Sequence, residues 1–140
     1  MFKWKVVANL TSSLGYTASS LGNHEFDDGV HDLEAFSSAI EDSYPLLACN
    51  IDTSGVPGLN GKIKPYSMHT IGQKNIAIIG YVTPETKELS DTGAVTFLDE
   101  VASIQKTVGQ VKALGADIII GVGHSGYEKD LEIARQVLLH

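Results

Sequence analysis

The residues best suited to chemistry lie in one short run, Gly22-Asn23-His24-Glu25-Phe26-Asp27. It places a neutral amide, an imidazole and two carboxylates on a single turn. The run follows an expected strand at residues 17–21 and precedes an expected helix that begins near Gly29. Proteins of the α/β class bind ligands at such junctions, beyond the carboxyl end of a strand. The sequence therefore predicts a ligand site at this turn.

The residue types in the turn indicate metal and phosphate chemistry. Asn23 offers an uncharged amide oxygen, which can bind a divalent cation without adding negative charge near a phosphate. His24 can donate a proton to a leaving oxygen, because its pKa lies near neutral. Asp27 can accept from the other ring nitrogen and keep the ring protonated to higher pH. An alternative stays open, in which Asn23 serves only the turn and Asp27 or Asp28 only caps the following helix.

A second candidate ligand is His124, which directly follows an expected strand at residues 117–121. Glycines on both sides let its ring approach an ion closely, and Ser125 or a backbone carbonyl is expected to hold the second ring nitrogen. A histidine that only ends the strand is the alternative. The same stretch, Gly121-x-Gly123-x-x-Gly126, also matches a dinucleotide-binding turn. That pattern normally belongs to the first βαβ unit of a fold, whereas here it lies near the end of the chain.

The remaining sequence must position these residues, and its pattern predicts an α/β fold. Apolar residues spaced by three and four predict helices over residues 29–42 and 128–139, and a long one that Thr96 caps and Gly115 ends. Strands are expected at residues 46–50, 66–71, 76–82 and 117–121, with Gln73-Lys74-Asn75 as a hairpin connection. The alternation of strands and helices predicts an α/β sandwich around a mixed, mostly parallel sheet.

Composition narrows the classes of function. A chain of 140 residues forms one domain of ordinary size, and its net charge of −7 with no cluster of Lys or Arg argues against nucleic-acid binding. A phosphate substrate would therefore need metal ions to supply positive charge. The apolar runs are too short for a transmembrane segment, and the N-terminus lacks a full signal-peptide core. Cys49 is the single cysteine, so it is expected to be a buried packing residue.

Four segments resemble the calcineurin-like metallophosphoesterases, and specifically the 5′-nucleotidase family that includes ecto-5′-nucleotidases and salivary apyrases. They are residues 22–29, 48–51, 79–86 and 123–128, in the order and approximate spacing of that family. The resemblance covers the chain from about Leu14 to its end. Residues 1–13 are therefore expected to be an atypical N-terminal segment, and residues 14–140 a partial metallophosphoesterase domain that is truncated at both ends.

The resemblance implies a hydrolase that removes phosphate from nucleoside monophosphates or diphosphates by metal-activated water. Asn23 and His124 would bind metal, and His24 with Asp27 would form the catalytic pair near the leaving group. The family uses two divalent metal ions, typically zinc, and an extracellular or cell-surface location is implied.

Departures from the family pattern imply that the chain alone is an incomplete and inactive fragment. The opening Asp-x-His metal pair and the bridging aspartate of the family are absent, a later Gly-His segment would lie just past His140, and the C-terminal substrate-binding domain is missing. A non-catalytic binding fragment is therefore an alternative. A nicotinamide-binding enzyme, through Gly121 to Gly126, is another.

Overall fold

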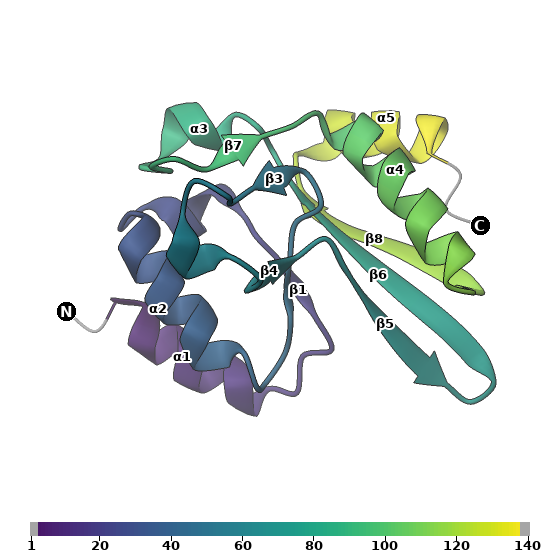
Figure 1. The fold of residues 1–140 in the computed structure, drawn as a ribbon, viewed down its shortest axis with the longest axis horizontal. Helices are drawn as coiled ribbons and strands as arrows, with labels where there is room; N and C mark the ends of the chain where they lie inside the picture. Colours follow the sequence, from purple (N-terminus) through teal and green to yellow (C-terminus); the bar gives the residue numbers. More distant parts are fainter. Residues whose placement is uncertain (1–2, 138–140) are drawn as a thin grey trace.

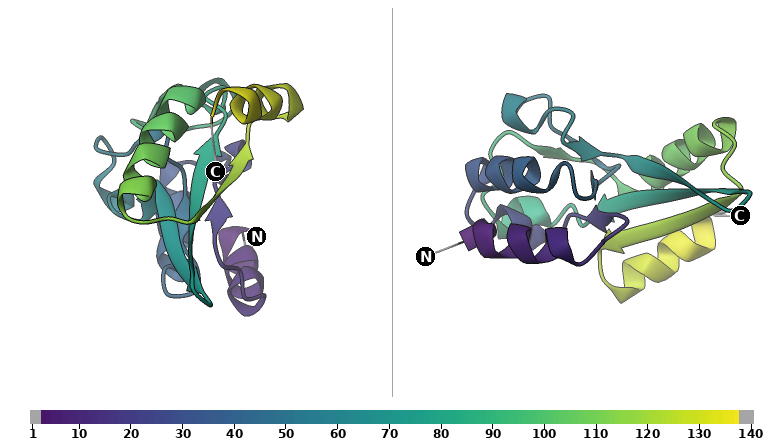
Figure 2. Two further views of the ribbon diagram at one scale, coloured as in Figure 1. Left: turned by 90° about the vertical axis from the view of Figure 1, so that its right-hand side faces the viewer. Right: turned by 90° about the horizontal axis from the view of Figure 1, so that it is seen from below.

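The computed structural model describes residues 3–137, which form three small sheets with helices on either side (Figures 1 and 2). The helices α1 and α2 lie side by side at one end of the molecule, and α4 and α5 lie at the other. The elements, in chain order, are α1 (Lys3–Ser13), β1 (Ser19–Ser20), the 3₁₀ turn η1 (Asn23–Phe26), α2 (Val30–Ile40), β2 (Leu46–Leu47), β3 (Ile51–Asp52), η2 (Pro57–Leu59), β4 (Ile63–Lys64), β5 (Tyr66–Ile71), β6 (Lys74–Val82), α3 (Thr86–Leu89), β7 (Thr96–Phe97), α4 (Glu100–Ala113), β8 (Ile118–His124) and α5 (Tyr127–Gln136).

The sheets are mixed, with more parallel than antiparallel pairs, which confirms the predicted fold class. Parallel pairing joins β1 to β2, β2 to β4 and β6 to β8. Antiparallel pairing joins β3 to β7 and β5 to β6. In the β6 and β8 pair, Val82 lies opposite His124, so both strands end at the same level of the sheet.

Two apolar cores hold these layers together. The first packs α1 and α2 against β1 and β2, with Leu21, Phe26 and Leu33 fully or almost fully buried. The second packs α4 and α5 against β6 and β8, with Ile79 and Val111 at its centre. The sheets meet at Gly80, where a side chain would collide with the backbone of Leu47. Close contact between the sheets therefore requires glycine at that position.

The start of α4 differs from the prediction. Thr96 lies in β7, where its extended backbone pairs with Asp52, so it cannot cap the helix. The N-cap is Asp99, whose side chain accepts a hydrogen bond from the backbone N–H of Ala102 at 2.8 Å. Aspartate at this position satisfies one of the free N–H groups of the first helical turn. The prediction of a long helix in this region is confirmed, and its cap was wrong.

The β5–β6 hairpin also turns earlier than predicted. Lys74 and Asn75 pair with Ile71 and Thr70 as part of the ladder, which leaves only Gly72 and Gln73 to make the turn. Gly72 has φ +62°, the left-handed conformation that glycine adopts without strain. The predicted connection at residues 73–75 therefore starts one residue and ends two residues too late.

The N-terminal residues form an α-helix that the sequence did not predict. Ala8 of α1 is buried in the first core and Trp4 packs against it. A boundary between an atypical segment and the main domain at residue 13 stays a prediction. His140 and the last two residues of the expected final helix, 138 and 139, lie outside the described residues, and α5 ends at Gln136 with Val137 extended. Within residues 3–137, no helix combines the length and apolar character needed to cross a membrane.

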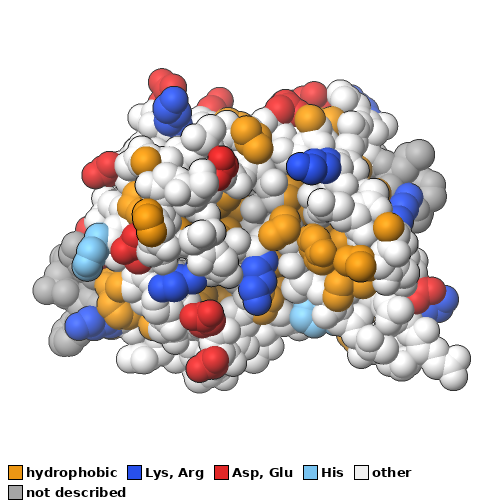
Figure 3. Space-filling view, viewed as in Figure 1, with side chains coloured by type: hydrophobic (Ala, Val, Ile, Leu, Met, Phe, Trp, Pro, Cys, Tyr) orange, Lys and Arg blue, Asp and Glu red, His pale blue; other side chains and the backbone are white. Residues whose placement is uncertain are grey.

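Cys49 lies beside a shallow hollow of about 300 Å³ between β4 and α4. Figure 3 shows apolar side chains gathered on the same face of the molecule. The thiol is largely enclosed, and burial raises its pKa to about 11. It therefore stays protonated at neutral pH and packs against the second core, as expected of a structural cysteine.

Candidate active site

The turn η1 is held by the buried ring of Phe26 and by a hydrogen bond to the Glu25 carboxylate. Phe26 is fully buried and meets Phe97 edge to face, with 5.7 Å between the ring centroids. The backbone N–H of Gly22 donates to Glu25 Oε2 at 2.6 Å, which is the one half of a capping box that a glycine can form. The side chains of His24 and Asp27 consequently project from the surface, with 76% and 53% of their areas exposed.

His24 and Asp27 form the predicted pair, with His24 Nδ1 2.7 Å from Asp27 Oδ2. The hydrogen bond to Asp27, followed by its negative charge, raises the pKa of His24 above the ordinary value. Hydrogen bonds from His24 and then Ser90 lower the pKa of Asp27. The N-cap of α2 is Gly29, so neither Asp27 nor Asp28 takes that position. The alternative in which Asp27 only caps the helix is therefore wrong.

His124 comes to this turn from the far end of the sequence. It ends β8, and its carbonyl oxygen accepts from the N–H of Thr83 at 2.8 Å. A Cβ atom built on Gly22 would lie only 2.7 Å from His124 Nδ1, so the imidazole lies directly against the glycine backbone. The structure thus brings the second candidate ligand next to the turn that carries Asn23 and His24.

Ser125 does not hold the His124 ring as expected. Its hydroxyl oxygen is buried and has no hydrogen-bond partner among residues 3–137. The strand continues through His124, so Ser125 lies in the turn into α5. The expected bond from Ser125 is therefore wrong, and the alternative, a bond to a backbone carbonyl, stays a prediction.

Two glycines of the possible dinucleotide motif are required by the fold itself. A side chain at Gly123 would collide with the ring of Tyr81, whose hydroxyl donates to Asp130 Oδ1 at 2.9 Å. Gly126 has φ +80° where the chain turns into α5. Packing and backbone conformation therefore account for these two positions without a bound cofactor.

The donor atoms fit part of a metal site. Asn23 supplies an amide oxygen and His124 an imidazole, a mixed oxygen and nitrogen set that divalent metals accept. In the described part of the chain, however, there is no group of three or more His, Cys, Asp or Glu side chains that could hold a metal ion. These residues can therefore contribute to a metal site that needs further ligands.

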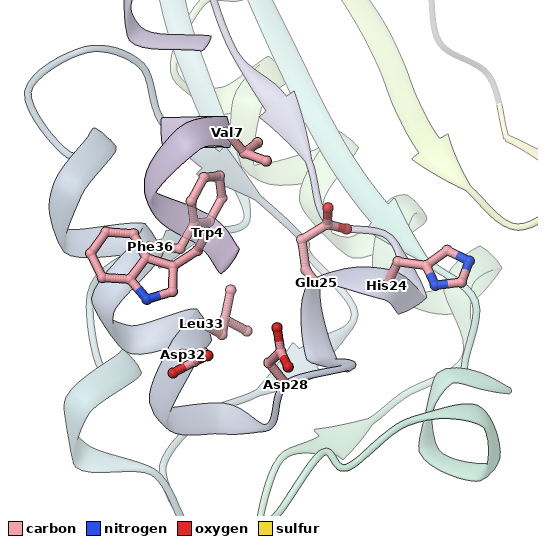
Figure 4. Close-up of a pocket in the computed structure, with 8 residues that line it drawn as sticks. All are labelled: Trp4, Val7, His24, Glu25, Asp28, Asp32, Leu33 and Phe36. Atoms are coloured by element: carbon pink, nitrogen blue, oxygen red, sulfur yellow. The ribbon is translucent and has the colours of Figure 1, made fainter. Parts of the chain in front are cut away.

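A hollow of about 210 Å³ adjoins the turn but does not suit phosphate. Three carboxylates line it, and their negative charge would repel a phosphate. Figure 4 shows the His24 ring pointing away from Trp4 and Phe36 on the opposite wall. The lining residues are Trp4, Val7, His24, Glu25, Asp28, Asp32, Leu33 and Phe36.

Sequence reasoning missed two residues that support the turn. Glu25 lies three residues after Gly22, the position from which a glutamate can reach back to the N–H at the start of the turn, so the sequence held half of a capping-box signal. Ser90 gave no signal, because its hydroxyl donates to the carbonyl oxygen of Asn23, which lies 67 positions earlier, at 3.0 Å. The same hydroxyl lies 3.0 Å from Asp27 Oδ1.

Replacing Asp27 by asparagine is expected to lower the pKa of His24, because the change removes both the carboxylate acceptor and its charge. The protonated ring would then be lost at lower pH, and any activity that needs it as a proton donor would decline earlier as pH rises. An NMR titration of the His24 ring protons measures this shift. Asp52→Asn, a change in β3, is the control and should leave the His24 titration in place. An unchanged titration in Asp27→Asn would contradict the pairing.

Comparison with known proteins supports the resemblance, although no protein-family model matches the chain. The 5′-nucleotidase of Gloydius brevicauda venom is 40% identical over 97% of this chain. The structure of a 5′-nucleotidase precursor from Thermus thermophilus superposes with a TM-score of 0.88 at 37% identity, over 95% of this chain. A calcineurin-like phosphoesterase from Bacillus subtilis gives a TM-score of 0.68 at 28% identity, over 89% of this chain and 39% of its own.

The chain spans about a quarter of the length of the two 5′-nucleotidases, 24% of the venom protein and 26% of the bacterial one. The match to each of them nevertheless includes almost every residue of this chain. Sequence and fold agree on the same relatives. Over nearly its whole length, the chain matches the N-terminal part of the 5′-nucleotidases and has the fold of the calcineurin-like phosphoesterases.

Proposed function

We propose that this segment supplies part of the active site of a metal-dependent phosphohydrolase that acts on nucleoside phosphates. The observation that carries the proposal is the position of the His124 ring against Gly22, beside the His24–Asp27 pair. An imidazole, an amide and a second imidazole with a carboxylate partner thus lie at one edge of the fold. The similarity to 5′-nucleotidases supports the same chemistry.

The roles follow from the chemistry of each group. Asn23 and His124 would hold a divalent metal, with zinc as the proposed ion because it accepts mixed nitrogen and oxygen ligands. When bound, the metal would supply an activated water and positive charge at the phosphate. His24, protonated and held by Asp27, donates a proton or hydrogen bond to the leaving oxygen. We also infer an extracellular or cell-surface location, in line with the venom relative.

The 140-residue segment by itself is expected to show no detectable turnover, because two donor side chains hold an ion only weakly. The purified chain would be incubated with AMP or ADP and excess zinc, and phosphate release would be followed over hours. Steady turnover that His24→Ala abolishes would overturn this expectation.

The same proposal predicts activity when the segment is completed. The chain would replace the matching stretch of the Thermus thermophilus 5′-nucleotidase, to which it superposes closely. The graft is expected to hydrolyse AMP, and to lose this activity when metal is removed by a chelator. A graft that also carries Ser38→Ala, a change on the exposed surface of α2, should keep this activity. A graft that folds and binds metal without hydrolysing AMP would refute the proposed function.

A further inference from the structure

Ser90 makes the polar link between α3 and the turn η1. It is half-buried directly after α3, and its backbone N–H donates to the carbonyl oxygen of Thr86 at 3.1 Å. Its hydroxyl lies 3.0 Å from the Asn23 carbonyl oxygen and 3.0 Å from Asp27 Oδ1. A hydroxyl has one proton, so it shares this proton between the two acceptors or alternates between them. Both acceptors belong to the candidate active site.

The other end of the same segment contacts the second half of the site. The N–H of Thr83 donates to the His124 carbonyl oxygen at 2.8 Å. Thr86 is fully buried, and its hydroxyl donates to the Thr83 carbonyl oxygen at 2.7 Å, which ties the short helix to the strand end. Residues 83–90 therefore run from the end of β6, where Thr83 is hydrogen-bonded to the end of β8, to the turn η1, where the Ser90 hydroxyl meets its two acceptors.

The residues after Ser90 fix it from the other side. A Cβ atom on Gly29 would lie 3.6 Å from Asp91 Oδ2, and one on Gly93 would lie 3.0 Å from Val30 Cγ2. Residues 91–93 thus pack against the start of α2. Ser90 is held by α3 on one side and by this packing on the other, so its hydroxyl has a defined position.

We propose that Ser90 is a positioning residue for the candidate phosphohydrolase site, a role that rests on the proposed function. The Asp27 side chain is exposed, and without a second partner its carboxylate could rotate away from His24. Ser90 fixes Oδ1, which leaves Oδ2 directed at His24 Nδ1. The bond to the Asn23 carbonyl holds the start of the turn in the same way. Ser90 therefore acts on His24 and Asn23 through the turn and not by touching substrate.

Ser90→Ala in the full 140-residue chain tests this role without any need for turnover. We expect hydrogen-exchange protection of the Asp27 and Gly29 amides to fall about tenfold, since a hydrogen bond to a charged group is lost. The carbon resonance of the Asp27 carboxylate should move as well. Ser90→Thr keeps the hydroxyl and should restore both signals. Ser38→Ala removes a comparable hydroxyl, which donates to the Glu34 carbonyl at 2.7 Å, and should change neither.

Amides in the middle of α4 report on global stability and should keep their protection in Ser90→Ala. Equal losses in α4 and in the turn would show that Ser90 only stabilises the fold, and would overturn the proposal. Unchanged signals at Asp27 and Gly29 would overturn it too. A graft without AMP hydrolysis refutes the proposed function but leaves these exchange results intact, so the two failures are distinguishable.

Discussion

Asn50→Leu is expected to destabilise the chain by about 3–5 kcal/mol, a large share of the stability of an ordinary domain. Asn50 is fully buried. Its Nδ2 donates to the carbonyl oxygens of Val82 at 2.8 Å and Leu98 at 3.1 Å, and its Oδ1 accepts from the Val82 N–H at 3.0 Å. Leucine has a similar size but leaves the two buried groups of Val82 and the part-buried Leu98 carbonyl without their partner. Each group left unpaired costs about 1–3 kcal/mol, which is why the expected effect is large.

Urea unfolding of the natural and substituted chains measures this loss. Asn60→Ala, an exposed change after η2, should alter the unfolding free energy by less than about 0.5 kcal/mol. Asn50→Asp should also destabilise, because a carboxylate oxygen would face carbonyl oxygens that now receive N–H groups. A loss of unfolding free energy below about 1 kcal/mol in Asn50→Leu would show that the three hydrogen bonds of Asn50 contribute little to stability. Because Asn50 bonds to Val82, it also fixes the strand end that leads into Thr83 and the site.

Gly22→Ala is expected to reduce kcat/KM of the grafted enzyme about a hundredfold while the fold persists. The new Cβ atom would lie 2.7 Å from His124 Nδ1 and 3.0 Å from Glu25 Oε2. Gly22 has φ −117°, a conformation open to alanine, so the backbone itself is not strained. The flexible His124 ring would move instead, and a ligand displaced by about 1 Å holds its metal poorly.

Steady-state kinetics of the graft and the NMR signals of the His124 ring in this chain test the prediction together. Gly109→Ala is the matched control, because a Cβ atom there meets nothing within 4 Å and the residue lies inside α4. It should leave activity unchanged and stabilise the helix by about 0.5–1 kcal/mol. Suppose that Gly22→Ala shifts the NMR signal of the His124 ring but keeps kcat/KM within threefold of the unsubstituted graft. This result would contradict a role for His124 in metal binding.

Local periodicity predicted the larger elements of the fold. The strand over Tyr66–Ile71 and the helix that became α2 follow from apolar spacing within one segment. The short strands β1 and β2 were predicted too long, since beyond Leu47 the backbone N–H of Cys49 donates to Gly80 of another strand and the pairing with β1 ends. The helix α1 was missed, since its exposed face is also apolar and weakens the periodic signal.

The candidate site was predictable to a similar extent. His24 and Asp27 lie three residues apart on one turn, so their contact followed from spacing. Gly22 and His124 lie at the carboxyl ends of β1 and β8, which belong to different sheets, so their approach agrees with the rule that α/β folds place ligand sites beyond strand ends. Ser90 and Asn50 were out of reach, because their partners lie far away in sequence and their residue types are common in loops. The metal and catalytic roles themselves stay predictions.

The segment over residues 83–90 places a limit on how the sequence can diverge. Each residue added to a helix lengthens it by about 1.5 Å and rotates its end by about 100°. One insertion within α3 would therefore swing the Ser90 hydroxyl off the turn, whereas Lys87, Glu88 and Leu89 are exposed and can be exchanged for other residue types. Across related proteins, the number of residues in this stretch should consequently vary less than the kinds of residue that fill it.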